Sequence, residues 1–230
     1  MPSGSKMFGQ LRPGGRLGWA RGATGALIGV ALAGLLGHVL PAGHHWPWIV
    51  APVGASAVLV FAVPASPLAQ PWSVLGGSMI SALAGLLVGH MLADVPTLAV
   101  GVAMGLAIAA MTYARCLHPP GGACAVLGAL TATSADGSWA VLLLPLGLNV
   151  AVLIAVGWLY NNLTGHAWPH RPVQAPPTPQ IPWVGTYQRA DLDAVLDEWD
   201  EVLDVNRDDL DALFRAVERR VARRWEDDRK

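Results

Sequence analysis

Charged side chains almost disappear from the long middle part of this sequence. From residue 22 to residue 170 there are only three, namely Asp94, Arg115 and Asp136, although the whole chain has 15 Lys and Arg and 16 Asp and Glu residues. A soluble domain of this size needs many more charges on its surface. The stretch therefore predicts an all-α, polytopic membrane helix bundle, with the bilayer as its main partner.

Six apolar segments divide this stretch, at residues 22–40, 49–63, 72–92, 97–113, 121–133 and 139–160. The second and fifth are short for a full crossing. A four-span alternative, in which both short segments are re-entrant, therefore stays open beside six spans. Arg12, Arg16 and Arg21 precede the first segment and place the N-terminus inside. An even number of spans returns the chain to the same side, so we expect a multi-pass protein of the inner or cell membrane with both termini in the cytoplasm.

The most unusual stretch is RCLHPPGGA, from Arg115 to Ala123. Its prolines and glycines indicate a sharp entry into a new helix, with proline where a missing N–H costs nothing. The small residues that follow are expected to leave backbone N–H groups open at the start of that helix. Such an end carries a partial positive charge and suits an anion.

A weaker copy of this stretch occurs earlier in the chain. Residues 52–59 (PVGASAVL) and 120–127 (PGGACAVL) share six of eight positions at an offset of 68 residues. The membrane domain is therefore predicted to consist of two three-helix repeats, about 22–92 and 97–160. An odd number of crossings in each half inverts the second half, which is the logic of secondary transporters.

The two short helices then enter from opposite faces, and we expect both starts to face one central anion site. The candidate binding residues are Gly54, Ala55, Ser56, His118, Gly121, Gly122, Ala123, Cys124 and Asn149, with Arg115 attracting anions at the inner mouth. Plainer interpretations stay open. The Pro-Gly pairs are also typical of simple turns, Arg115 of a topology determinant and His118 of a capping or packing residue. Asn149 either lines a pathway or binds a neighbouring helix.

The rest of the chain divides by composition. Residues 1–20 form a basic, cytoplasmic N-terminal segment, and the membrane domain covers 21–165. A proline-rich linker at 166–184 is expected to be stiff and extended. Apolar residues recur at three- and four-residue steps across 185–230, which predicts a cytoplasmic connector of two amphipathic helices separated near Asn206.

Several classes of function find no support in the sequence. The spans contain no nucleophile–base pair, no carboxylate pair and no metal-ligand spacing, and the two cysteines lie eight residues apart without nearby ligands. The basic residues from Arg219 to Arg224 are balanced by nearby acids. We therefore expect no enzyme, no cofactor, no metal site and no nucleic-acid partner.

Three motifs carry a resemblance to a known family. LHPPGGA from Leu117 to Ala123 resembles the signature of the HPP family of integral membrane proteins, and GASA from Gly54 and SPLAQP from Ser66 are similar to that family as well. The resemblance covers about residues 21–171. It has two departures: Cys124 stands where a threonine is common, and Trp72 where a basic residue often follows.

The resemblance implies a function that the residues alone do not name. Chloroplast and cyanobacterial-type members are associated with nitrite transport, and many bacterial members carry paired CBS domains after the membrane region. The first hypothesis is therefore a transporter or channel for a small monovalent anion, nitrite first. The alternative is a membrane-anchored sensor or regulatory scaffold that couples to a CBS-type module. We also expect a homodimer, joined through the glycine-rich first segment or through the tail.

Overall fold

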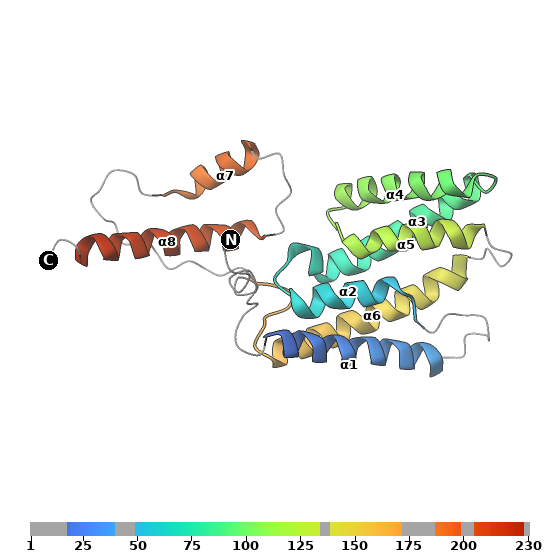
Figure 1. Cartoon of the computed structure of the whole chain (residues 1–230), viewed down its shortest axis with the longest axis horizontal. Coiled ribbons are helices and arrows are strands. Elements are labelled where there is room, and N and C mark those ends of the chain that lie inside the picture. Colours follow the sequence, from blue (N-terminus) through green and yellow to red (C-terminus); the bar gives the residue numbers. More distant parts are fainter. Residues whose placement is uncertain (1–17, 40–48, 134–138, 172–186, 199–204, 228–230) are drawn as a thin grey trace, which may run out of the picture. The chain divides into compact units, whose positions relative to one another are not determined.

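The computed structural model describes residues 18–39, 49–133, 139–171, 187–198 and 205–227, and these ranges contain helices and turns but no strand (Figure 1). The chain forms two compact units, Met1–His170 and Arg171–Lys230. Each unit is described by itself. Most of the predicted N-terminal segment 1–20 and of the linker 166–184 lies outside the described residues, and the first helix already includes residues 18–20.

The membrane unit contains six helices and one short 3₁₀ turn. They are α1 (Gly18–Val39), α2 (Pro52–Ala62), η1 (Pro67–Ala69), α3 (Pro71–Met91), α4 (Pro96–Tyr113), α5 (Pro119–Ala132) and α6 (Trp139–Leu163). Helices α1, α3, α4 and α6 are long and apolar enough to cross a membrane by themselves. Helices α2 and α5 have 11 and 14 residues. At 1.5 Å per residue they extend about 16 and 21 Å, against about 30 Å of hydrocarbon. The polytopic all-helical fold predicted from the sequence is confirmed.

The short helices nevertheless continue the alternation of direction along the bundle (Figure 1). Helix α2 ends where α1 begins, because Arg21 at the start of α1 donates a hydrogen bond of 2.7 Å to the carbonyl of Phe61. Helix α5 runs beside α3 in the same direction, with His118 against Gly77 at one end and Ala129 against Gly89 at the other. A re-entrant segment would turn back to the side it came from. The course of the chain therefore favours six spans over four, and how far the two short helices cross the bilayer stays a prediction.

The contacts between helices can be compared across the two predicted repeats. Helix α1 packs on α2 and on α6, as α4 packs on α5 and on α3. Helix α2 runs beside α6 in the same direction, since Val50 bonds Asn149 and Val60 bonds Asn161. The pair α5 and α3 repeats that arrangement in the other half.

Glycines bring α3 and α5 unusually close together. A Cβ added to Gly85 of α3 would lie 2.1 Å from the carbonyl oxygen of Ala125 in α5, and one added to Gly128 of α5 would lie 2.5 Å from that of Ala82. Small residues at such positions let helix backbones pack tightly in lipid, where packing drives association. The glycines of α1 also face their own chain, since Gly25 and Gly29 lie against Phe61.

The second unit contains α7 (Arg189–Glu198) and α8 (Arg207–Asp227), as the periodicity of the tail predicts. Arg189 forms an ion pair with Asp208, at the start of α8. Asp211 accepts a hydrogen bond from Arg215 at 2.9 Å and another from the Tyr187 hydroxyl at 2.9 Å. The bond from Arg215 is the main cause that lowers the pKa of Asp211 below its usual value.

Replacing Gly85 with alanine should lower the thermal unfolding midpoint of the detergent-solubilised protein. The added methyl has no room beside Ala125, and overpacking of a helix contact costs about 1–3 kcal/mol. Gly101→Ala in α4 is the matched control, because no atom lies within 4 Å of the place its Cβ would take. Alanine is also the better helix former by about 1 kcal/mol, so this midpoint should hold or rise. Equal midpoints for the two variants would contradict the close packing of α3 on α5.

Candidate functional site

The imidazole of His118 is fully buried where the two halves of the membrane unit meet. His118 is the residue immediately before α5, with an extended backbone. Its Nδ1 lies 2.8 Å from the carbonyl oxygen of Leu68 in η1, and its Nε2 lies 2.8 Å from Oγ of Ser56 in α2. One ring therefore joins three segments, of which two belong to the first half and one to the second.

These partners decide which ring nitrogen carries the proton. A carbonyl oxygen only accepts hydrogen bonds, so Nδ1 of His118 is the donor to Leu68. In the neutral ring Nε2 is then an acceptor, and the hydroxyl of Ser56 donates to it. The Ser56 hydroxyl also lies 3.2 Å from the carbonyl of Pro52, one turn earlier in α2.

That second acceptor allows the ring to take up a proton without losing a hydrogen bond. In the protonated ring Nε2–H donates to Oγ of Ser56, and the hydroxyl turns to the carbonyl of Pro52. Both protonation states thus keep both ring nitrogens bonded. The hydrogen-bond geometry fits a neutral or a protonated ring, whereas the complete burial of the ring opposes the charged form.

Local sequence explains why the ring sits there. Pro119 and Pro120 fix the first turn of α5 and hold His118 extended before it. The facing residue of α3 is Gly77, where a Cβ would lie 2.5 Å from Cβ of His118. Any larger residue at position 77 would collide with the histidine.

The first N–H groups of the short helices are either missing or bonded within the chain. In α5 the first two residues, Pro119 and Pro120, have no N–H, and Gly121 donates to the carbonyl of His118 at 2.7 Å. In α2 the first residue is again proline, and the next two donate to the carbonyls of Val50 and Ala51 at 3.0 Å. Proline and tight turns therefore remove or use the first donors of each short helix, including the N–H of Gly54. The partial positive charge of each helix start remains.

Asn149 serves the other short helix. It is fully buried in α6, and its Oδ1 accepts a hydrogen bond of 3.0 Å from the N–H of Val50, just before α2. Its Nδ2 donates to the carbonyl of Ala33 in α1 at 3.3 Å. Of the two interpretations from the sequence, the structure shows the binding of neighbouring segments.

The remaining predicted residues lie around this centre rather than in it. Gly54 and Ala55 are on the exposed face of α2, and Ala123 is on the exposed face of α5. Gly121 and Gly122 are buried, and Gly122 lies against Met104. Cys124 is also buried and has a hydrogen bond to Ser78. Arg115 is exposed after the end of α4, with a backbone φ of 53°.

Two residues near His118 and the start of α5 were not among the candidates from the sequence. Leu68 takes part through its backbone carbonyl, for which no residue type gives a signal. Ser81 of α3 is fully buried beside Gly121, and its hydroxyl has no hydrogen-bond partner among the described residues. Ser81 and Asn149 are 68 residues apart, which is the repeat offset. That spacing was available in the sequence and places one polar residue beside the start of each short helix.

Comparisons with known proteins agree with a membrane domain of this kind. The family model described as "HPP, transmembrane region" matches residues 13–169. One transmembrane protein of Dictyostelium discoideum is 28% identical over 149 residues, covering 64% of this chain and 47% of the relative. Another from the same organism is 29% identical over 117 residues, covering 50% and 41%. The chain thus spans about half the length of these curated relatives or less. No solved structure matches it.

The ring of His118 should be protonated at Nδ1 and bare at Nε2 in its neutral form. Labelling the histidine ring nitrogens with ¹⁵N and recording their chemical shifts at alkaline pH measures this directly, with His118→Gln giving the assignment by difference. Ser56→Ala should move the Nε2 shift and leave Nδ1 nearly unchanged, because only Nε2 loses its partner. A neutral ring protonated at Nε2 would contradict the contact with Leu68.

Proposed function

This chain belongs to the HPP family of integral membrane proteins, and from that membership and the site at His118 we propose that it moves a small monovalent anion, nitrite first, across the membrane. Nitrite comes from the family resemblance, which implies the transport of that anion in chloroplast and cyanobacterial-type members. The arrangement of two inverted halves, each with a short helix starting inside the bundle, also supports a transporter.

The observation that carries the proposal is the buried, fully bonded imidazole between α2 and η1 at the start of α5. Ionisable side chains inside membrane segments are costly and are functional by default. Within residues 18–39, 49–133 and 139–171, His118 is the only buried side chain that can carry a positive charge. We therefore propose that a charged substrate binds beside His118.

An anion inside the bundle needs a positive partner, because an isolated charge in a low dielectric is strongly disfavoured. A protonated His118 supplies that charge, and the hydroxyl of Ser56 lets the ring accept the proton without an unpaired nitrogen. The positive end of the α5 dipole attracts the anion, and the anion in turn attracts a proton to the ring. Anion and proton would then cross together, so that no net charge passes through the bundle.

Orientation and location belong to the same proposal. Arg21 lies at the end of the bundle where α2 and α6 finish, since it bonds the carbonyl of Phe61 and Oδ1 of Asn161. Arg115 follows the end of α4, next to the start of α3, where Trp72 donates to the carbonyl of Ala114. Basic residues gather at the cytoplasmic side. We therefore propose a cell-membrane protein whose Arg21 and Arg115 both face the cytoplasm.

The homodimer expected from the sequence also stays a proposal. The contacts of α1 make this helix a less suitable dimer interface than its sequence suggested. Gly25 and Gly29 of the first span lie against Phe61 of their own chain, and Gly25 also lies against Tyr160. Helix α1 therefore offers fewer small residues to a second copy than its sequence suggests. A dimer contact would depend on other surfaces, such as the tail.

The tight contact of α3 on α5 favours a second candidate function. Gly85 and Gly128 leave no space between these helices, which suits a rigid support. In that case the protein would be a membrane-anchored sensor or regulatory scaffold that couples to a CBS-type module. Flux distinguishes the two candidates, because a scaffold moves no substrate.

Proteoliposomes of the full chain should take up nitrite when an inward proton gradient is imposed, above the leak of nitrous acid into empty vesicles. His118→Gln should lower the protein-dependent rate at least about tenfold, since it removes a charged partner worth about 1.5–3 kcal/mol. Ser56→Ala should lower it roughly fivefold, by about 1 kcal/mol. His38→Gln, at an exposed histidine of α1, is the matched control and should leave the rate unchanged.

Two results would count against this proposal. Protein that is folded yet adds no flux to that of empty vesicles would remove transport and favour the scaffold. Full flux in His118→Gln would keep transport but remove the imidazole from its mechanism.

A further inference from the structure

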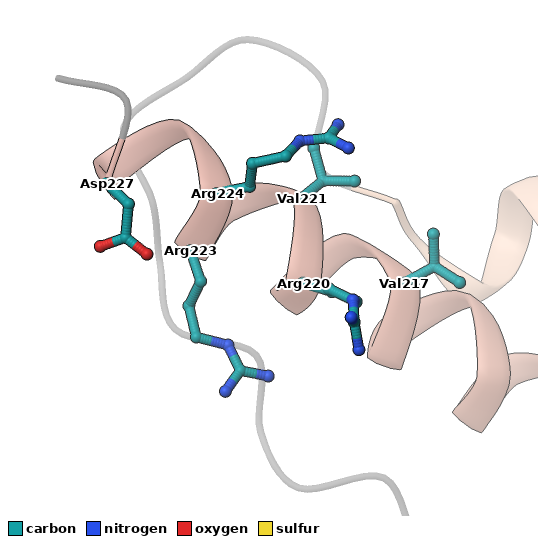
Figure 2. A pocket seen from close by; sticks show the side chains of 6 residues that line it. All are labelled: Val217, Arg220, Val221, Arg223, Arg224 and Asp227. Carbon is teal, nitrogen blue, oxygen red and sulfur yellow. The ribbon is translucent and has the colours of Figure 1, made fainter.

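The last turns of α8 present an unpaired group of arginines. A hollow of about 630 Å³ is lined by Val217, Arg220, Val221, Arg223, Arg224 and Asp227. Figure 2 shows the guanidinium groups projecting from successive turns of the helix. Among the described residues, none of the three arginines forms an ion pair, with Asp227 or any other carboxylate.

The first turns of α8 differ, because opposite charges meet there within the tail. Arg189 pairs with Asp208, and Arg207 lies 3.8 Å from Asp193 in α7. Arg215 pairs with Asp211 at 2.9 Å. Four acids of the tail, Asp193, Asp197, Asp208 and Asp211, thus have arginine partners near the start of α8. The arginines near its end were expected from the sequence to be balanced by nearby acids, but Arg220, Arg223 and Arg224 have no ion-pair partner among the described residues.

Apolar side chains follow the same helix at three- and four-residue steps. Leu213 is 58% exposed and Val217 is 52% exposed, and Phe214 and Trp225 are exposed as well. Spacings of three and four residues place these side chains on one face. An exposed apolar face beside a row of arginines is the pattern of a helix that lies in a membrane interface.

We propose that α8 binds a lipid surface that carries anionic headgroups, with Leu213, Val217 and Trp225 in the headgroup boundary and Arg220, Arg223 and Arg224 at the phosphates. This inference is independent of anion transport. The charge of the arginine group is complementary to phosphate, and the long arginine stems allow the charged ends to stay in water while the helix face is buried. Tryptophan is favoured at the same depth.

The chain also delivers α8 to such a surface. The tail follows α6, which ends at Leu163 and is long and apolar enough to span a membrane. An extended chain spans at most about 3.5 Å per residue. The residues between Leu163 and Arg207 are therefore enough to let α8 reach the surface of the same bilayer. A soluble partner would have to be found from solution, whereas the bilayer is always present.

Hydrogen–deuterium exchange of the full chain in nanodiscs tests this proposal. Amides of residues 213–225 should exchange more slowly in discs that contain phosphatidylglycerol than in discs of phosphatidylcholine alone. Each arginine near an anionic surface strengthens attachment roughly fivefold, so three together predict about a hundredfold difference in exchange rate at low salt. The difference should vanish at high salt, because the attraction is screened.

Two triple variants separate the lipid surface from other partners. R220E/R223E/R224E should lose the dependence on phosphatidylglycerol, whereas R220K/R223K/R224K should keep it, because a lipid surface responds to charge and not to guanidinium geometry. Wild-type exchange that is equal in the two kinds of disc would overturn the proposal without any variant. Protection that depends on the number of protein copies in each disc, and not on lipid charge, would also overturn it and assign this face to a second copy.

Discussion

A helix that starts inside a bilayer leaves backbone groups that water does not reach, and each of these groups must find a partner within the protein. Helices α2 and α5 both start beside residues that are buried within the membrane unit, Val50 and His118. Proline at the first position removes one donor from α2 and, with a second proline, two donors from α5. Tight turns use the next donors, and Asn149 accepts the N–H of Val50 before α2. The first backbone donors of the short helices are thus removed or bonded within the protein itself.

Close packing at glycine residues allows His118, before α5, to form its two hydrogen bonds. Helix α3 lies so near α5 that Gly77 is the residue that admits the ring of His118. With the backbones at that distance, the imidazole reaches Leu68 in η1 and Ser56 in α2. The histidine therefore bonds the first half of the protein to the second, and its position depends on a contact that carries no polar group.

Much of this could be predicted from the sequence, because the signals were strong and local. The scarcity of charged residues predicted the membrane helix bundle. The offset of 68 residues predicted that α2 and α5 occupy corresponding positions in two repeats. The prediction of open N–H groups overlooked that Pro119 and Pro120 leave α5 without its first two donors. The pairing of Ser56 with His118 was out of reach, because it joins residues 62 apart and depends on the tilt and depth of two helices. Asn149 was predicted to be important, but only the fold shows which backbone it bonds.

The two halves also differ in a way that the repeat makes visible. Shifting Val50 by the offset of 68 gives His118, and shifting Ser81 gives Asn149. The first half thus places an apolar residue before its short helix and receives an amide from α6, which does not titrate. The second half places an imidazole there and receives the hydroxyl of Ser81, which has no partner among the described residues. One start is thus bonded by an amide that does not titrate, whereas the other carries an imidazole and lies beside a hydroxyl without a partner among the described residues. Under the proposed function, this difference between the two starts is where a proton would be coupled to the substrate.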